Sequence, residues 1–331
     1  MLRRSRLGAA LVAALALVPA ATAAAQGPPP PTAAGGKPVT AVGNGVGTPT
    51  SFATDGTNVF LGSAPSEGGP STPGGVWVLK DGQFTRIEGT PELVFGLAYA
   101  DGVLYVSAGK QLVALSDFDG TSFGTSKTIY KAGKKFPGFN GLIMGRDGRL
   151  LAGVSLDPRF DGKKNPNPNT DAVVSLTTKG KDLKVVAEGL RQPWQFTYLG
   201  KQKWPLVSSL ALDEDPAPDD IIVPAKPGTD YGYPTCRPGN AKTCKGFTKA
   251  RILLPPHSSP MGLASVGKRL YAALFGGIGK SGPEVVSMNA KGKDITPVLT
   301  GFVAPVVALT IVDGTLYAGD VTGTVYATPL S

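Results

Sequence analysis

The sequence lacks several features that would identify common classes of protein. No window of useful length has the periodicity of an amphipathic helix, and 45 glycines with 30 prolines argue against helices. Neither a Gly-x-Ser-x-Gly segment nor a glycine-rich phosphate loop with a following lysine is present, which argues against those hydrolase and nucleotide sites. The net charge of +9 is scattered without a basic stripe, which argues against nucleic acid as a partner.

Histidine and cysteine are scarce. The only histidine, His257, lies in a proline-rich segment. The only two cysteines, Cys236 and Cys244, flank a Pro-Gly turn. In an exported protein this spacing predicts a local disulfide, and the lack of histidine nearby disfavours a metal site at the pair.

A long apolar run occurs only at the N-terminus. Three arginines among the first six residues precede an uncharged apolar stretch over residues 8–24, and a small-residue cleavage sequence follows ahead of Gln26. This arrangement is typical of a secretory signal peptide, residues 1–25. A membrane anchor is the alternative, but the run is alanine-rich and Pro19 interrupts it. We therefore expect a secreted, periplasmic or cell-envelope protein with no membrane span after cleavage.

The next segment, residues 26–36, contains four consecutive prolines and several glycines. Such a segment cannot bury enough apolar area to order itself, so it predicts a semi-stiff spacer. The remaining residues, 37–331, are assigned to one folded domain.

An internal repeat predicts the architecture of this domain. Each copy has an apolar strand, a tight turn that is usually Asp-Gly, and an apolar-aromatic strand. Asp-Gly between apolar runs is a strong hairpin signal, because glycine accepts a positive φ without steric cost. The turns lie at Asp55, Asp101, Asp147, Gly200, Gly267 and Asp313, at steps of 46, 46, 53, 67 and 46 residues. A four-stranded propeller blade takes about 40–50 residues, so the sequence predicts an all-β, six-bladed β-propeller.

The two ends of the domain predict how the ring closes. The last repeat stops after a strand around residues 323–327, which corresponds to the third strand of a blade. An apolar strand at residues 38–42 precedes the first repeat. We predict that it supplies the missing outer strand of the last blade, which would remove an exposed edge. The two longer steps indicate long loops, where sites are usually built.

Motifs in the long loops resemble those of a known family. Residues 189–194 read Gly-Leu-Arg-Gln-Pro-Trp, residues 230–234 read Asp-Tyr-Gly-Tyr-Pro, and residues 257–262 read His-Ser-Ser-Pro-Met-Gly. In order and spacing they are similar to segments of the secreted glucose/sorbosone dehydrogenases, which bind pyrroloquinoline quinone (PQQ). That family folds as a six-bladed propeller, and the resemblance covers most of residues 40–327.

The resemblance implies a cofactor site at these loops. Four residues would contact the quinone: Arg191, Gln192, Tyr231 and Tyr233. Main-chain carbonyls of Asp215 and Pro216 would face a calcium ion, for which oxygen ligands are appropriate. A structural brace at a blade turn is the alternative role for Arg191.

Three parts of the family pattern are missing. The catalytic histidine of the family corresponds to a position at or near Pro137, and the two segments that carry the cofactor-clamping cations begin here at Phe275 and Val303. Oxidation of a sugar at its anomeric carbon needs a base for the hydroxyl proton. His257 is the one candidate base, if its loop folds over the central pocket; a structural role is its alternative.

The sequence leaves two functions open. The first is a quinone-dependent sugar or alcohol dehydrogenase with a displaced base. The second is a non-catalytic propeller that binds a glycan, peptide or protein partner in the cell envelope. A metal-dependent lactonase would need converging acidic and asparagine ligands, and the sequence does not place them.

Overall fold

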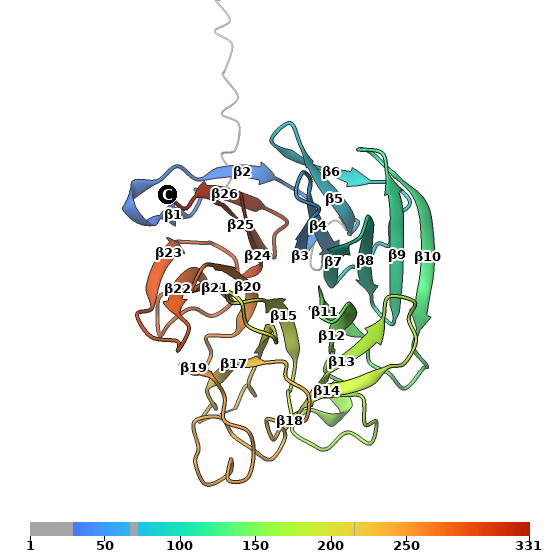
Figure 1. Cartoon of the computed structure of the whole chain (residues 1–331). Helices are drawn as coiled ribbons and strands as arrows, with labels where there is room; N and C mark the ends of the chain where they lie inside the picture. Colours follow the sequence, from blue (N-terminus) through green and yellow to red (C-terminus); the bar gives the residue numbers. More distant parts are fainter. Residues whose placement is uncertain (1–28, 67–71, 215) are drawn as a thin grey trace, which may run out of the picture.

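The computed structural model describes residues 29–66, 72–214 and 216–331 (Figure 1). The predicted signal peptide lies outside these ranges. Within them the helical elements are two short 3-10 turns, η1 (Ala34–Gly36) and η2 (Pro158–Phe160). No helix in the described part of the chain is long and apolar enough to cross a membrane.

The strands form six sheets around a central channel, which confirms the predicted six-bladed propeller (Figure 1). Each blade is numbered in sequence order, and its strands are given from the innermost outward. Blade 1 is β3 (Thr48–Thr54), β4 (Val59–Ala64), β5 (Gly75–Lys80) and β6 (Gln83–Ile87); blade 2 is β7 (Gly96–Ala100), β8 (Val103–Ala108), β9 (Gln111–Phe118) and β10 (Phe123–Lys131); blade 3 is β11 (Phe139–Met144), β12 (Arg149–Val154), β13 (Ala172–Thr177) and β14 (Lys184–Glu188).

The remaining blades follow the same plan, with additional strands at some outer edges. Blade 4 is β15 (Pro193–Thr197), β16 (Leu206–Ser209), β17 (Asp220–Pro224) and β19 (Ile252–Leu254); blade 5 is β20 (Pro260–Val266), β21 (Arg269–Leu274), β22 (Glu284–Asn289) and β23 (Thr296–Thr300); blade 6 is β24 (Val306–Val312), β25 (Thr315–Asp320), β26 (Val325–Pro329) and β2 (Thr40–Gly43). The short strand β18 (Thr229–Asp230) joins the outer edge of blade 3 in parallel with β14.

The six sequence repeats are the inner hairpins of the six blades. The turn between β7 and β8 shows why Asp-Gly recurs there. Asp101 and Gly102 have φ values of 51° and 78°. A two-residue hairpin turn of this kind needs positive φ at both positions, which glycine and aspartate tolerate.

The ring closes as predicted. Strand β2 pairs antiparallel with β26, with Thr40 opposite Ala327 and Ala41 opposite Tyr326. Strand β2, which precedes the first repeat, therefore completes the blade formed by the end of the chain. This closure covers the edge of β26, which would otherwise expose a row of main-chain donors and acceptors.

The expected spacer, residues 26–36, is ordered at its C-terminal end. Thr32 and Ala33 form strand β1, which pairs with Thr300 and Leu299 on the outer edge of blade 5. Ala33 is buried. The edge of β23 supplies main-chain partners that the composition of the segment does not reveal, so the folded domain begins before residue 37.

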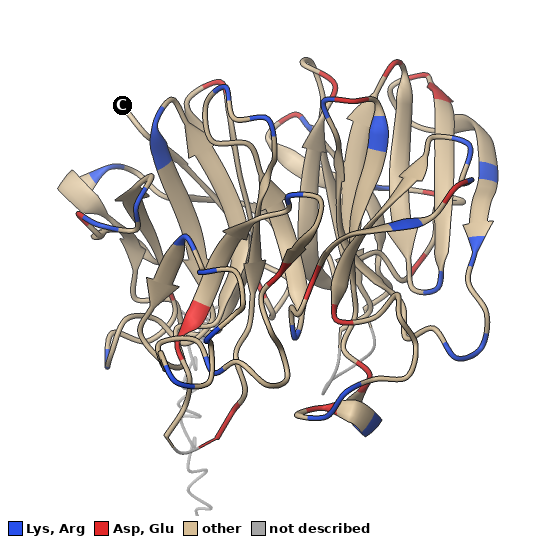
Figure 2. Ribbon diagram, turned by 60° about the horizontal axis from the view of Figure 1, so that its bottom comes forward, with Lys and Arg blue, Asp and Glu red and all other residues tan. Residues whose placement is uncertain are grey.

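The core consists of apolar layers between neighbouring blades. Phe60 of blade 1 and Leu104 of blade 2, for example, are fully buried in one layer, and corresponding clusters lie between each following pair of blades. Charged residues are interspersed over the loops at both ends of the sheets (Figure 2). This arrangement makes the blades a rigid support for the loops.

The two faces of the ring differ. All six inner strands run in the same direction, so the repeat hairpins lie together on one face, called here the hairpin face. The opposite face is called the long-loop face. The long-loop face carries the connections that precede each inner strand, and the long loops at residues 155–171 and 210–219. Residues 225–251 run along the outer side of blade 4.

Candidate functional site

Arg191 lies just before β15 on the long-loop face and is bound by an aspartate from the preceding loop. Its Nε donates to Oδ1 of Asp161 at 2.8 Å, and its Nη2 donates to Oδ2 at 2.7 Å. The Nη1 atom donates to the main-chain oxygen of Ala211 at 2.6 Å. With 11% of its side chain exposed, Arg191 ties the loops at residues 155–171 and 210–219 to the start of β15. These contacts favour the bracing role that the sequence left open.

Tyr233 binds the same aspartate. Its hydroxyl donates to Oδ1 of Asp161 at 2.8 Å and accepts from the main-chain nitrogen of Gly162 at 2.6 Å. Burial raises the pKa of Tyr233, and hydrogen bonds from Arg191 lower the pKa of Asp161. The tyrosine is therefore a neutral donor and the aspartate an anion, so the three residues form one charge-assisted network.

Tyr231 is part of the core. It is 3% exposed between blades 3 and 4, and its hydroxyl donates to the main-chain oxygen of Pro224 at 2.7 Å. Gln192, beside Arg191, is half-buried. Among the four residues that the resemblance assigned to a quinone, the structure thus gives Arg191, Tyr231 and Tyr233 contacts within the protein.

The calcium loop of the resemblance is described only in part. Asp215 lies outside the described residues, and Pro216 is exposed. Glu214 pairs with Arg237, and Asp220 accepts from the main chain of the neighbouring loops. Within the described ranges there is no group of three or more His, Cys, Asp or Glu side chains that could hold a metal ion.

The candidate base is exposed. His257 lies in the connection between β19 and β20, with a φ of 65°. At the position of the family's catalytic histidine, Pro137 follows Phe136, whose ring packs against Phe139 at 4.8 Å between centroids. Pro137 is half-buried, and Phe136 and Phe139 on either side of it belong to the apolar layer between blades 2 and 3.

The space at the predicted quinone mouth is small. Arg191, Tyr233 and residues 209–212 enclose about 20 Å³ together with Asp219 and Arg237. This is close to the room that one water molecule needs. A larger hollow of about 330 Å³ lies next to it, on the other side of Tyr233.

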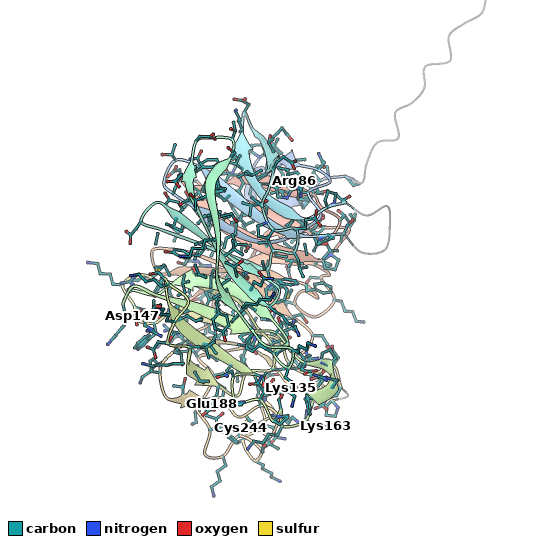
Figure 3. The ribbon with its side chains drawn as sticks, turned by 90° about the vertical axis from the view of Figure 1, so that its right-hand side faces the viewer. Arg86, Lys135, Asp147, Lys163, Glu188 and Cys244 are labelled. Atoms are coloured by element: carbon teal, nitrogen blue, oxygen red, sulfur yellow. A yellow bond between two sulfur atoms is a disulfide. The ribbon has the colours of Figure 1, made fainter. Side chains whose placement is uncertain are left out.

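This larger hollow, called here the loop cavity, is rich in hydrogen-bonding side chains. Its polar lining includes one lysine, Lys164, together with Asn165, Asn167, Asp171, Glu188, Asp230 and Tyr233, and the ring of Phe247 forms part of its wall. The two asparagines are held by turns in which their Oδ1 atoms accept from main-chain nitrogens two residues later. Figure 3 shows Glu188 at the same end of the molecule as Lys163 and Cys244, opposite Arg86.

Asp171 is the titratable group that stands out in the loop cavity. Burial raises its pKa to about 7, and the negative charges of Asp161 and Asp157 act in the same direction. Its side chain makes no hydrogen bond or ion pair with the described part of the chain. A cavity-lining carboxyl that titrates near neutral pH is typical of a functional site.

Two glycines allow the walls of this cavity to approach each other. A Cβ on Gly189, whose φ is 71°, would lie 2.2 Å from the nitrogen of Gly232 and 2.3 Å from Oδ1 of Asp230. A Cβ on Gly232, whose φ is 90°, would lie 2.5 Å from the ring of Phe247. Both positions require glycine, because a side chain would have no room and an unfavourable backbone conformation.

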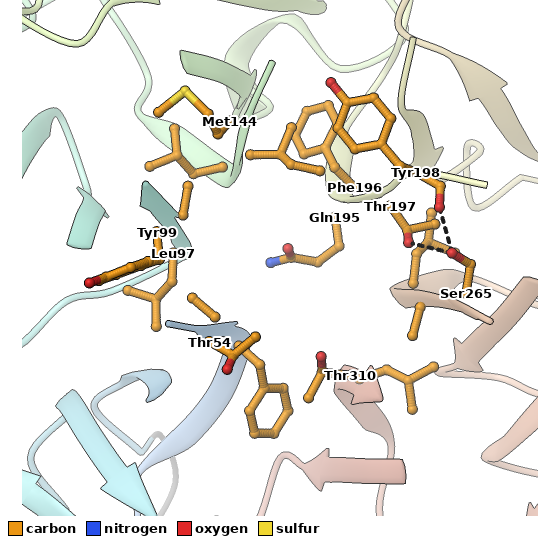
Figure 4. A pocket seen from close by; sticks show the side chains of 18 of the residues that line it. Thr54, Leu97, Tyr99, Met144, Gln195, Phe196, Thr197, Tyr198, Ser265 and Thr310 are labelled. Atoms are coloured by element: carbon orange, nitrogen blue, oxygen red, sulfur yellow. Dashed lines mark hydrogen bonds between the residues drawn. The ribbon is translucent and has the colours of Figure 1, made fainter. Parts of the chain in front are cut away.

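The central channel opens on the hairpin face into a hollow of about 360 Å³ (Figure 4). The side chain of Gln195 projects into the middle of the ring, and Tyr99, Met144 and Thr310 lie around it. No charged residue of the described chain lines this hollow. The Nε2 of Gln195 donates to the main-chain oxygens of Thr50 at 2.8 Å and Phe95 at 3.0 Å, so it crosses the channel.

Sequence reasoning did not find Gln195, Asp161 or Asp171. A signal for Gln195 exists, because the equivalent position of every other repeat holds a small residue. These are Ser51, Gly96, Gly141, Gly262 and Ala308. Five small residues leave room in the channel for one long side chain. The two aspartates lie in a loop that was predicted to be long, but no local pattern sets them apart.

The predicted disulfide between Cys236 and Cys244 is present, with Cα atoms 4.4 Å apart. It lies directly after the Tyr233–Pro234 turn. Part of the same loop, Phe247, lines the loop cavity. The bond therefore constrains a segment next to that cavity.

Comparison with known proteins gives matches only through structure. No protein-family model and no curated protein match the sequence. A glucose dehydrogenase from Thermus thermophilus, described as a putative oxidoreductase, matches with a TM-score of 0.67 and 16% identity, over 88% of this chain and 100% of that one. A PQQ-bound aldose sugar dehydrogenase from Streptomyces coelicolor matches with a TM-score of 0.67 and 15% identity, over 90% and 99%.

A gluconolactonase from Xanthomonas campestris is also similar, with a TM-score of 0.63 and 12% identity over 92% of this chain and 95% of that one. At these identities the likeness concerns the fold. It confirms, at that level, the resemblance to six-bladed sugar dehydrogenases that the loop motifs indicated.

Proposed function

We propose that this chain is an exported propeller that binds a saccharide in the loop cavity and does not use a quinone. The observation that carries the proposal is the composition of that cavity. A hollow of about 330 Å³ lies within the usual size range of small-molecule sites and has several converging polar side chains.

The chemistry of the lining suits a polyol. Each saccharide hydroxyl both donates and accepts a hydrogen bond. Glu188 and Asp230 supply acceptors, and the side-chain amides of Asn165 and Asn167 supply donors. The ring of Phe247 supplies an apolar surface for the carbon-bound hydrogens of a sugar ring.

Asp171 would adapt to the ligand. With a pKa of about 7, its carboxyl is both a donor and an acceptor when protonated and is an acceptor alone when ionised. We expect Asp171 to be protonated where a sugar hydroxyl accepts its hydrogen bond and ionised where a sugar hydroxyl donates one. The fold supports a sugar ligand only by analogy, because the similar structures are named as sugar dehydrogenases and a gluconolactonase.

The residues present do not fit PQQ, which carries three carboxylates. The charge of Arg191 is already neutralised by Asp161, and the space beside it is about 20 Å³. In the lining of the neighbouring loop cavity the three carboxyl groups of Asp171, Glu188 and Asp230 outnumber the one ammonium group of Lys164, so the cavity would repel the cofactor. The family's cation-bearing segments contain the exposed apolar residues Phe275 and Val303 here. Among the described residues, no cluster of acidic side chains would add ligands for calcium to the main-chain carbonyls that the resemblance implies.

The decisive experiment is calorimetric titration of the mature protein with a panel of mono- and oligosaccharides. We expect saturable binding that weakens at least tenfold in Asp171→Asn and in Glu188→Gln. Asp101→Asn is the matched control, because Asp101 is an exposed carboxylate on the hairpin face. The affinity of this variant for the saccharide should equal that of the parent protein. Absence of binding at millimolar saccharide, or equal affinity in all three variants, would refute the proposal.

A second assay addresses quinone chemistry directly. The protein is incubated with PQQ and calcium, and reduction of an electron-accepting dye is followed with the same saccharides. We expect no dye reduction above that without protein, and no calcium-dependent rise in melting temperature. Sugar-dependent dye reduction would restore the dehydrogenase hypothesis.

A further inference from the structure

A second cavity, separate from the loop cavity, lies under the disulfide loop on the outer side of blade 4. It has a volume of about 540 Å³, which is within the range of sites that hold small molecules. Strands β17 and β19 form its floor through Ile221 and Leu253, and the segment from Cys236 to Ala250 forms its walls. It is called here the disulfide cavity.

The walls of the disulfide cavity are largely apolar. Ile221, Phe247, Ala250 and the ring of Tyr231 face it, and the hydroxyl of Tyr231 is already bonded to Pro224. Leu253 lines it while remaining 48% exposed. When an apolar ligand covers an exposed leucine in a hollow with apolar walls, both lose contact with water. The loss of this contact makes the free energy of binding more favourable.

The charge at the cavity has one sign. Lys245 and Lys249 line it, and no aspartate or glutamate of the described chain does. Neither lysine forms an ion pair with a described residue. An apolar hollow with two ammonium groups at its rim is complementary to a molecule that has an apolar body and an anionic end.

The cavity is formed before any ligand arrives. The Cys236–Cys244 bond closes its wall. Main-chain hydrogen bonds join Cys236 to Gly232 at 2.7 Å, Cys244 to Asn240 at 3.1 Å and Thr248 to Asp230 at 2.7 Å. A wall held in this way loses little conformational entropy on binding, which favours affinity.

We propose that the disulfide cavity binds an anionic amphiphile, an acyl chain that ends in a carboxylate or a phosphate. The chain lies against Leu253, Ile221 and Phe247, and the anionic end contacts Lys245 and Lys249. A free fatty acid and a phospholipid share this chemistry. The site does not depend on saccharide binding, because it is lined by a different set of side chains apart from Phe247.

The first test is a chain-length series. Octanoate, decanoate, dodecanoate and tetradecanoate are titrated below their micelle concentrations by calorimetry. Each added methylene that is buried should lower Kd about fourfold, from the transfer free energy of a methylene group, until the hollow is full. No saturable binding, or a Kd independent of chain length, would overturn the proposal.

Variants of the floor and the rim locate the ligand. Leu253→Asp should abolish dodecanoate binding, because it places a carboxylate in the apolar floor. Val266→Asp is the matched control, since Val266 is also 48% exposed on a strand but lies outside the cavity, and its Kd should equal that of the parent protein. Equal loss in both variants would contradict the assignment. Circular dichroism verifies that each variant is folded.

The lysines are tested with a charge-free ligand. The double variant Lys245→Ala, Lys249→Ala should bind dodecanoate at least tenfold more weakly and dodecanol with unchanged affinity. Lys268→Ala, outside the cavity, should change the affinity for neither ligand. An equal loss of affinity for dodecanoate and dodecanol would show that the lysines do not bind the anionic end.

Vesicles of phosphatidylglycerol distinguish the source of the ligand. Sedimentation of the protein with vesicles, lost in Leu253→Asp, would indicate a membrane lipid, while binding of dodecanoate without sedimentation would indicate a free fatty acid. A third outcome would overturn the proposal. If the affinity for acyl ligands did not depend on chain length and a peptide from a phage library competed with dodecanoate, the cavity would be a protein-docking groove.

Discussion

The side-chain nitrogen of Gln195, in blade 4, donates a 2.8 Å hydrogen bond to the main-chain oxygen of Thr50, in blade 1 on the opposite side of the ring. A second bond from the same nitrogen reaches Phe95, at the start of blade 2. One side chain thus joins three blades across the channel. The five small residues at the equivalent positions of the other repeats make this reach possible.

Removal of the Gln195 amide should destabilise the ring. Gln195→Leu loses one buried and one partly buried hydrogen bond and removes a donor from two carbonyl oxygens, so the free energy of unfolding should fall by about 1–3 kcal/mol. Urea denaturation measures it. Gln83→Leu is the control, because the Gln83 amide makes one exposed 3.3 Å bond, and its effect should stay within about 0.5 kcal/mol. Equal effects would contradict the bracing role of Gln195.

Arg191→Met should reduce stability even though Arg191 lies in a loop. The substitution leaves Asp161, which is partly buried, without its bidentate partner, and we expect a loss of about 1–3 kcal/mol. Lys184→Met breaks the exposed pair with Asp182 and should cost less than about 1 kcal/mol. A double-mutant cycle with Asp161→Asn isolates the interaction. A coupling energy near zero would show that Arg191 does not act through Asp161.

Asp171 should make stability depend on pH. Its pKa is raised to about 7 in the folded protein, whereas an unfolded aspartate titrates near ~4. The folded state therefore binds more protons between these values, so stability should fall as pH rises from about 4 to about 7. Asp171→Asn removes this penalty. Its melting temperature should exceed that of the parent protein at about pH 8 and match it at about pH 4; an identical difference at both would contradict the assignment.

Truncations of the N-terminus should act in steps. Removal of residues up to 30, which takes away only exposed residues of the described chain, keeps both β1 and β2 and should leave the melting temperature unchanged. Removal of residues up to 36 deletes β1 and exposes the edge of β23, so the melting temperature should fall slightly. Removal up to 43 also deletes β2, opens the ring and should cause aggregation. Equal melting temperatures and solubility for the last two would show that β2 does not close the ring.

The disulfide should contribute to stability in the oxidised protein. For a short loop such as that between Cys236 and Cys244, the chain-entropy estimate is about 2–3 kcal/mol. A variant with both cysteines replaced by serine should unfold at correspondingly lower denaturant. Mass spectrometry of exported protein should find no thiol that reacts with alkylating agent; two reactive thiols would contradict the pairing.

The loop motifs singled out residues whose contacts within the protein could not be predicted from the sequence. The sequence assigned Arg191, Tyr231 and Tyr233 to a cofactor, and the structure places all three beside the loop cavity or in the core next to it. Within the protein their hydrogen bonds go to Asp161, Ala211 and Pro224. A motif records which residue types occupy a turn, while the partner of each side chain depends on what the adjacent loop brings to it.

The all-β class, the six inner hairpins, the closing strand and the disulfide could all be predicted from the amino-acid sequence. Each follows from short-range chemistry: alternating apolar residues, Asp-Gly turns with positive φ, and two cysteines close enough to meet across one turn. Only the tertiary structure decided that Arg191 binds Asp161, 30 residues away, and that Gln195 reaches Thr50, 145 residues away. Packing of blade 4 against blade 3 brings the first pair together, and closure of the ring brings the second pair together. Neither contact leaves a pattern between neighbours in the chain.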